Sequence, residues 1–509
     1  MKKYIALIIT AFFIALPGSA QRNDAVIEKL ADTYTVKPDG STVMNHKKQV
    51  KILTHRAFNN LYGETFVVYN PQFQKLTINK SYTRMADGKI VQAPKNAFNE
   101  SLPHMAARAP QFAGLREMVI THTALEIGAT IYLDYTIETK PGFLASGSFL
   151  RRFDMKDPVR DYTLRFAAPA EQLYLAQNVG RDAKESVEGG SRVAEFRFRD
   201  IPGIKDRDVA PAAIPYVYAS VYGSEESARR IATFKQLKVV RDRALESSLD
   251  KAGSAREKAE IACAFAAGLD NNSTTLEALG KLRCPACVVR SGYGTPMEKA
   301  VLMASVLKMQ KVDFESYLVF APVLPVCVQS LDYALIKVDG KFYNPVSGKV
   351  VDIDRVGASH KVVGADGRVL ETRPYTMKVE EKKAVRLSEL SSEKAGRFVV
   401  VNIPDAARMN QYRFYSRRNE AFGFDYCIDA HIEYTIDLEG RKLVSPDFET
   451  ELKNSVGEVR ISISGNADKV VARRELKILK QTVSVGEYRQ LLALMKVWND
   501  HRGSRLVFE

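Results

Sequence analysis

The sequence has little of what marks specialised protein classes. Five cysteines among 509 residues are too few for a disulfide-rich scaffold, and 30 glycines with 20 prolines are too few for a collagen-like or disordered chain. Short-period repeats, low-complexity tracts, phosphate-binding loops, serine nucleophile elbows and zinc-protease helix motifs are absent from it. With 46% hydrophobic residues the chain is an ordinary globular protein, and its length predicts about three domains.

Charge of one sign does not dominate. The net charge is +14, from 74 basic and 60 acidic side chains. Basic pairs such as Arg473-Arg474 and Lys382-Lys383 have acidic neighbours and no interleaved aromatic residues. This pattern favours a solvated basic surface over a nucleic-acid site, and it leaves adhesion to anionic envelope material open.

A single long apolar run stands near the start of the chain, from Tyr4 to Leu16, directly after Lys2 and Lys3. Small residues ending at Ala20 follow it, a pattern typical of a signal peptide over residues 1–20. The run is too short to cross a bilayer comfortably, and no cysteine follows it as a lipid anchor. We therefore expect an exported protein without a transmembrane segment, in the periplasm first, with the outer surface or secretion as alternatives.

The rest of the chain is expected to form a multi-domain α+β protein. Residues 21–222 consist of strand-like runs separated by turn signals such as Asp87-Gly88, which predicts an antiparallel β-sandwich-like domain. The stretch from Pro94 to Phe112 is a long irregular loop, and such loops are either functional or mobile.

Helix signals begin after this β-rich region. Residues 223–383 mix helices with strands, and Ser254 with Glu257 forms a capping box. The pair Val288-Val289 is strand-like. Residues 384–509 return to strands, which predicts a β-sandwich-like domain. A second capping box at residues 484–487 opens its terminal helix, which carries Trp498 and is expected to end at Gly503.

The most informative segment runs from residue 290 to residue 303. Thr295 and Glu298 form a capping box, and Pro296 occupies the first helical position, where its missing N–H group has no cost. The residues that follow are apolar on most faces. The segment therefore predicts a buried helix with a well-defined start.

This segment resembles the transglutaminase-like superfamily, whose papain-like core begins its central helix with a nucleophilic cysteine. The resemblance places Pro296 at the cysteine position. It places Tyr333, in the stretch 331–338, at the position of the catalytic histidine, and Asn344, in the stretch 341–345, at that of the aspartate. The resemblance therefore implies a degenerate triad.

The likeness extends to both ends of the chain. Residues 109–116 and 128–135 are similar to a β-rich domain of unknown function that precedes transglutaminase-like domains in exported Gram-negative proteins. Residues 485–488 and 506–508 are similar to the β-domain that closes the same proteins. The order of the three modules covers nearly all of the mature chain.

The replaced triad argues against catalysis. Cysteine chemistry needs a thiolate and an adjacent base, and a neutral tyrosine with a reference pKa near 10 cannot take the base role at ordinary pH. The resemblance thus implies a pseudoenzyme without a cofactor. Tyr293, Thr295, Tyr333 and Asn344 are expected to line a cleft that binds a peptide, a glycan or an envelope protein.

Two other interpretations of the function stay open, a relocated cysteine nucleophile and an inert spacer. Cys284 and Cys287 form a CxxC pair, for which a local disulfide ranks first, free thiols second, and a redox or metal site last. Cys287 assisted by His360 is the alternative nucleophile of a cysteine-dependent amide hydrolase or acyltransferase. The third reading is an inert spacer between two β-domains. The seven histidines are scattered and predict no metal site, and Cys263 and Cys427 are expected to be buried small side chains.

Overall fold

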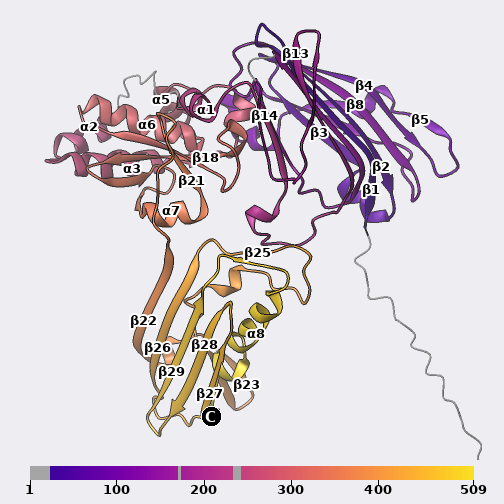
Figure 1. Ribbon diagram of the computed structural model, residues 1–509. Coiled ribbons are helices and arrows are strands. Elements are labelled where there is room, and N and C mark those ends of the chain that lie inside the picture. The colour runs from indigo at the N-terminus through magenta and orange to yellow at the C-terminus, as the bar shows by residue number, and fades with distance from the viewer. Residues whose placement is uncertain (1–22, 170–172, 233–241) are drawn as a thin grey trace, which may run out of the picture.

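The structure is a computed structural model that describes residues 23–169, 173–232 and 242–509. The predicted signal peptide, residues 1–20, lies outside the described residues. The chain is rich in strands and forms several sheets in several domains, which appear as three successive lobes in Figure 1. Across the described ranges, no helix combines the length and the apolar character that a membrane crossing needs.

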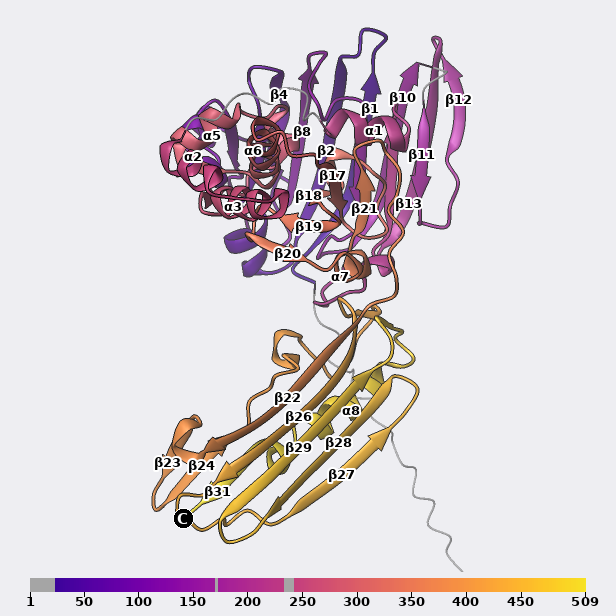
Figure 2. The same ribbon diagram turned by 90° about the vertical axis from the view of Figure 1, so that its left-hand side faces the viewer.

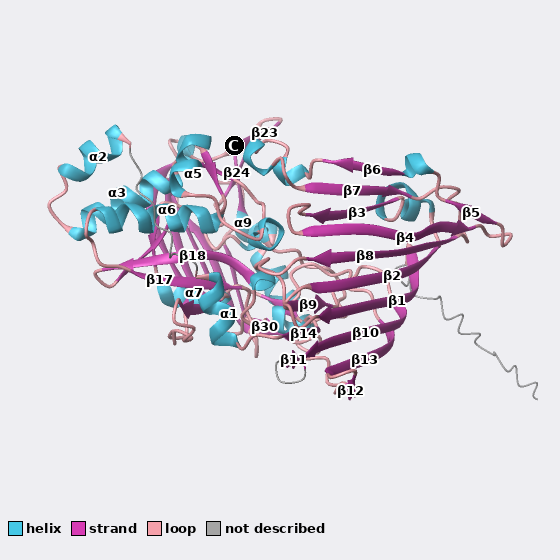
Figure 3. Cartoon of the chain, turned by 90° about the horizontal axis from the view of Figure 1, so that it is seen from above, coloured by secondary structure: helices cyan, strands magenta, loops and turns pink. Residues whose placement is uncertain are grey.

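The first lobe is built on an eight-stranded sheet, whose strands lie side by side in Figure 3. Its order is β12 (Lys184–Glu188), β13 (Ser191–Ile201), β10 (Val159–Pro169), β1 (Ala25–Val36), β2 (Thr42–Ile52), β8 (Thr130–Thr139), β4 (Gln74–Arg84) and β5 (Ile90–Gln92).

One pair departs from the antiparallel pattern that the sequence predicted, because β1 runs parallel to β10. A parallel pair needs a long connection, and residues 37–158 supply one. Turn signals between neighbouring runs cannot reveal such a distant pairing.

Two three-stranded sheets accompany this sheet. One contains β11 (Tyr174–Gln177), β14 (Tyr216–Ser220) and β9 (Ser148–Arg152), and the other β3 (Glu64–Tyr69), β7 (Arg116–Thr121) and β6 (Phe98–Ser101). Leu164 and Phe166 of β10 share a buried core with Val217 and Ala219 of β14, so the first of them packs on the large sheet. The stretch expected to be an irregular loop contains β6 and the short helices η2 (Lys95–Ala97), η3 (His104–Ala106) and η4 (Pro110–Phe112).

The central lobe has a five-stranded sheet in the order β20 (Lys349–Val351), β19 (Lys341–Asn344), β18 (Leu331–Val338), β17 (Glu315–Phe320) and β21 (Lys361–Gly364). Its helices are α1 (Ser224–Ile231), α2 (Arg243–Asp250), α3 (Ala255–Ala267), α4 (Leu276–Leu279), α5 (Pro285–Ser291), α6 (Pro296–Met309) and α7 (Ile353–Ser359), with η7 (Val328–Ser330) and the parallel pair β15 (Asp270–Asn271) and β16 (Tyr293–Gly294).

Local signals explain most of these elements. The capping box of Ser254 and Glu257 is present at the start of α3 and confirms the prediction. The expectation of a strand at Val288-Val289 is wrong, because Cys284 caps α5 and the helix continues to Gly292, whose φ of +76° ends it.

The last lobe contains a sheet in the order β22 (Thr376–Arg386), β26 (Cys427–Asp437), β29 (Lys469–Ile478), β28 (Gly457–Gly465) and β27 (Phe448–Lys453). Helix α8 (Tyr488–Trp498) covers one face of this sheet (Figure 2), and Trp498 is fully buried there. The remaining elements are η8 (Leu387–Glu389), β23 (Ser392–Ala395), β24 (Phe398–Asn402), η9 (Met409–Gln411), β25 (Phe422–Gly423), β30 (Thr482–Val483), α9 (His501–Ser504) and β31 (Arg505–Phe508).

The terminal helix ends earlier than the sequence predicted. It stops at Trp498 rather than at Gly503, because the Asp500 side chain accepts a hydrogen bond from the Arg502 amide and so starts the separate helix α9. Strand β22 lies parallel to β26, so this sheet is not purely antiparallel either.

Candidate functional site

The start of α6 is the position to which the sequence assigned the site, and its geometry is well determined. The Thr295 hydroxyl accepts a hydrogen bond from the Glu298 amide at 3.3 Å, and the Glu298 carboxylate accepts one from the Thr295 amide at 3.0 Å. Pro296 occupies the first helical position. The predicted capping box is confirmed, and every residue from 297 to 307 is buried.

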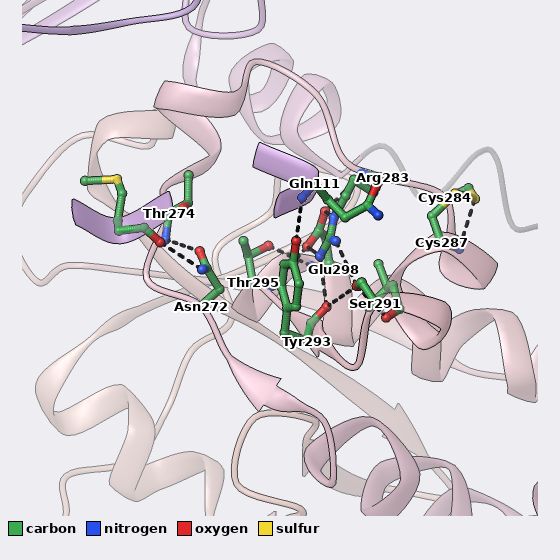
Figure 4. A network of polar contacts seen from close by, with 12 residues as sticks. Gln111, Asn272, Thr274, Arg283, Cys284, Cys287, Ser291, Tyr293, Thr295 and Glu298 are labelled. Carbon is green, nitrogen blue, oxygen red and sulfur yellow. Dashed lines mark hydrogen bonds and ion pairs between the residues drawn. A yellow bond between two sulfur atoms is a disulfide. The ribbon is translucent and has the colours of Figure 1, made fainter. Parts of the chain in front are cut away.

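A buried ion pair anchors this helix start (Figure 4). Two nitrogens of the Arg283 guanidinium each donate to one Glu298 oxygen at 2.8 Å. The same group donates to the Ser291 hydroxyl and to the Tyr293 carbonyl, both at 2.9 Å. The Glu298 side chain is 0% exposed and that of Arg283 13%, so the pair is shielded from solvent and its hydrogen-bonding groups are matched.

A segment of the first lobe lies over this ion pair. The Gln111 amide donates to the Tyr293 hydroxyl at 2.8 Å, and the Arg283 guanidinium lies 4.5 Å from the Phe112 ring centre and 4.6 Å from that of Tyr293. Nearby, the Asn272 side chain donates to the Met105 carbonyl at 2.9 Å. Residues 105–112, part of the stretch that the sequence marked as functional or mobile, are thus docked beside the start of α6.

Lys299 is the one charged residue of α6 that is fully buried without a carboxylate contact in the described residues. Its ammonium donates to the Leu269 carbonyl at 2.6 Å and to the Ala267 carbonyl at 3.4 Å, just where α3 ends. Burial lowers the pKa of this lysine. Lys299 therefore ties the end of α3 to α6 and has a structural role.

Tyr333 lies on the opposite side of the central sheet from α6. Its neighbours along β18, Ala334 and Ile336, pack in the clusters that contain α6 residues, whereas Tyr333 packs with Leu335 and Val356 on the α7 side. Successive side chains of a strand point to opposite faces, so Tyr333 cannot face Pro296. Its ring instead meets that of His360, at 5.8 Å between centres.

Asn344 is also occupied by local structure. Its side-chain oxygen accepts hydrogen bonds from the Val346 amide at 2.9 Å and from the Ser347 amide at 3.2 Å, which forms the turn after β19.

The four residues expected to line one cleft are therefore not brought together. Thr295 is buried as a helix cap, Tyr293 lies under residues 111–112, Tyr333 faces α7, and Asn344 forms a turn. The expectation of a common cleft rested on matching sequence positions, and the direction of each side chain depends on the strand face that the fold selects.

The cysteines offer no free thiolate at this site. Cys284 and Cys287 are joined in a disulfide, and no contact joins either of them to His360 in the described structure. Burial raises the pKa of the Cys263 thiol to about 11 and also raises that of Cys327 and Cys427. Cys263 is buried as expected, while Cys427 is half-buried. Among the described residues, no group of His, Cys, Asp or Glu side chains could hold a metal ion.

Sequence reasoning missed Arg283, the residue that connects the most groups in this region. Its partner Glu298 is 15 positions away, and the aromatic rings on either side of it come from different lobes. The only signal was an arginine placed just before the CxxC pair, which by itself indicates nothing.

Comparisons with known proteins match two separate parts of the chain to families. Residues 38–205 match the family described as a Domain of Unknown Function with solved-structure structure (DUF3857), and residues 397–508 match the corresponding family DUF3858. The prediction of an N-terminal β-rich domain of unknown function is confirmed. A search of the curated proteins finds no match.

The chain is similar over almost its whole length to a solved structure from Parabacteroides distasonis that is described as a "putative protease". The two are 27% identical with a TM-score of 0.79, over 95% of this chain and 99% of the other. An M1 zinc metallopeptidase from Deinococcus radiodurans is 13% identical over 39% of this chain and 42% of that one, with a TM-score of 0.22, which is too low to indicate a shared fold.

Proposed function

We propose that this protein is an exported, non-catalytic binding or structural protein whose central lobe is a degenerate transglutaminase-like domain. The observation that carries the proposal is the start of α6, where Pro296 is the first helical residue; the sequence resemblance assigns this position to the nucleophile. Residues 111–112 pack on Tyr293 just before it. A site for acyl transfer needs a nucleophile in contact with a base and room for a substrate, and this arrangement supplies neither.

The electrostatics support the same proposal. The charged groups at the helix start satisfy one another, since Arg283 and Glu298 form a closed pair, and so they serve stability rather than proton transfer. The raised pKa of each remaining thiol disfavours the thiolate form. Export, with the periplasm as the first compartment, fits a chain that carries a disulfide. The partners would be peptides, glycans or envelope proteins.

The competing function is a cysteine-dependent amide hydrolase, and the protease description of the Parabacteroides distasonis protein keeps it worth testing. In that case Cys287 would act with His360. The pairing requires reduction of the disulfide and the loss of the present contacts of the His360 ring, which packs on Tyr333 and lies 3.6 Å from the Asp332 carboxylate.

The test combines two assays on the purified mature chain. The first measures release of fluorescent product from a casein and peptide-amide panel, for the wild type and for His360→Ala and Cys287→Ser. We expect no turnover above buffer in any of them. Turnover that disappears in both variants would establish the hydrolase and overturn the proposal.

The second assay is thiol labelling followed by intact mass, on native and denatured protein across a pH series. Because the free thiols have raised pKa values, we expect no native thiol to label below about pH 7, well under the reference thiol value. Rapid native labelling at low pH would identify a nucleophile and contradict the proposal.

A further inference from the structure

A cavity of about 370 Å³ lies where the first lobe meets the central lobe. Its walls come from β1, β2 and β8 and from residues 143–150 on one side, and from α4 and η7 on the other. This volume is in the lower part of the range that small-molecule sites occupy. None of the four residues expected to line a cleft borders it, so it is distinct from the start of α6.

Glu277 of α4 is the acidic side chain in this cavity. The Glu277 side chain is exposed to solvent at the edge of the cavity, yet the surrounding protein raises the pKa of its carboxyl by desolvation. Among the described residues that border the cavity there is no Lys, Arg or His. The carboxylate therefore has no cationic partner in the cavity wall.

The hydrogen bonds around Glu277 hold its environment in place. Gln329, which borders the cavity beside Glu277, donates its side-chain amide to the Ser148 carbonyl at 3.2 Å. The Ser148 hydroxyl donates back to the Gln329 side-chain oxygen, also at 3.2 Å. These reciprocal bonds connect the two lobes across the cavity, so its shape is set by matched polar groups.

Aromatic rings form the wall on the side of the first lobe. Tyr34, Phe143 and Phe149 border the cavity, and the Tyr34 and Phe149 rings lie 5.5 Å apart. The Tyr34 hydroxyl accepts a hydrogen bond from the Gly147 amide, which fixes the ring. Aromatic faces attract organic cations, and a carboxylate without a counter-charge does so as well.

We propose that this interlobe cavity binds an alkylammonium group, with its nitrogen at the Glu277 carboxylate and its carbon chain against Tyr34 and Phe149. The group would come from a small free amine or from a lysine side chain. The inference gives a site and a ligand class to the binding role proposed above and rests on that role.

The experiment is isothermal titration of the full mature chain with three probes of similar length. These are 1,5-diaminopentane, the amide of Nα-acetyl-lysine, and 1,5-pentanediol, which lacks the charge. We expect saturable binding of an amine and at least tenfold weaker binding of the diol. Binding of the lysine derivative would indicate lysine side chains as the source, and binding of the diamine alone would indicate a small free amine.

The variant Glu277→Gln keeps the shape and removes the charge, and Glu226→Gln alters an exposed acid on α1 as the matched control. We expect at least a tenfold loss of amine affinity in the first and none in the second. Equal affinity in both variants, or equal binding of amine and diol by the wild type, would overturn the inference. The comparison of amine and diol binding by the wild type tests the inference even if Glu277→Gln fails to fold. The turnover assay remains a separate readout for catalysis, so failure of either proposal can be recognised independently.

Discussion

Removing the Arg283 side chain tests the central claim that a closed ion pair holds the start of α6. Arg283→Ala eliminates two hydrogen bonds to Glu298, one to Ser291, one to the Tyr293 carbonyl, and the stacking on Phe112. It leaves the Glu298 carboxylate, 0% exposed, with only backbone donors. Breaking a buried pair in this way costs about 3–5 kcal/mol.

The measurement must be local, because a chain of several domains does not unfold in one step. We would measure the opening free energy of α6 by native-state hydrogen exchange of peptides that cover residues 296–309. Arg256→Ala is the matched control, since Arg256 forms an exposed i,i+4 pair with Glu260 at 3.1 Å. Such a pair contributes about 0.3–0.5 kcal/mol.

A second substitution sharpens the argument. Glu298→Gln retains a side chain that can complete the capping box and removes the buried charge. Added to Arg283→Ala, it should therefore recover about 1–2 kcal/mol of the loss, because no unpaired carboxylate remains. The reasoning is refuted if Arg283→Ala costs α6 less than about 1 kcal/mol, or if the double variant is less stable than the single one.

Two further predictions concern contacts between lobes. Phe112→Ala removes the ring that packs on Tyr293, so trypsin should cleave the variant faster than the wild type at exposed Arg108. Mass spectrometry of the digest measures the rate, and equal cleavage would show that the ring does not hold this segment. Burial and the neighbouring Asp206 raise the pKa of Glu420 to about 7, above the value near 4.3 in an unfolded chain, so stability falls as pH rises between these values. Above pH 7, Glu420→Gln should therefore raise the melting temperature of the unfolding transition that involves the last lobe, and it should leave that temperature unchanged near pH 4; a pH-independent difference would contradict the assignment.

Some of the sequence-based expectations depended on interactions within a few residues, and these agree with the structure. The capping boxes at residues 254–257 and 295–298 are present because one short turn supplies both partners. The turn of Asp339 and Gly340, with φ of +46° and +73°, joins β18 to β19, and an Asp-Gly pair is typical of such hairpin turns.

Other expectations failed where the answer depended on distant partners. The parallel pairing of β1 with β10 and the end of α8 at Trp498 were not predicted. Tyr333 was matched by sequence to a catalytic position, but β18 turns it toward α7, next to an irregularity in its pairing with β17. A sequence motif does not specify a strand face, and a shift of one residue reverses it.

The sequence by itself determined the β-rich character of the N-terminal part and the start of the central helix at Pro296, because residue identity and short-range hydrogen bonds suffice for these. Only the tertiary structure decided that Arg283 pairs with Glu298, that residues 111–112 cover Tyr293, and that Glu277 borders a cavity between lobes. Each of these joins elements from separate parts of the chain. These arrangements depend on burial and on contacts between groups that the chain brings together only when it folds.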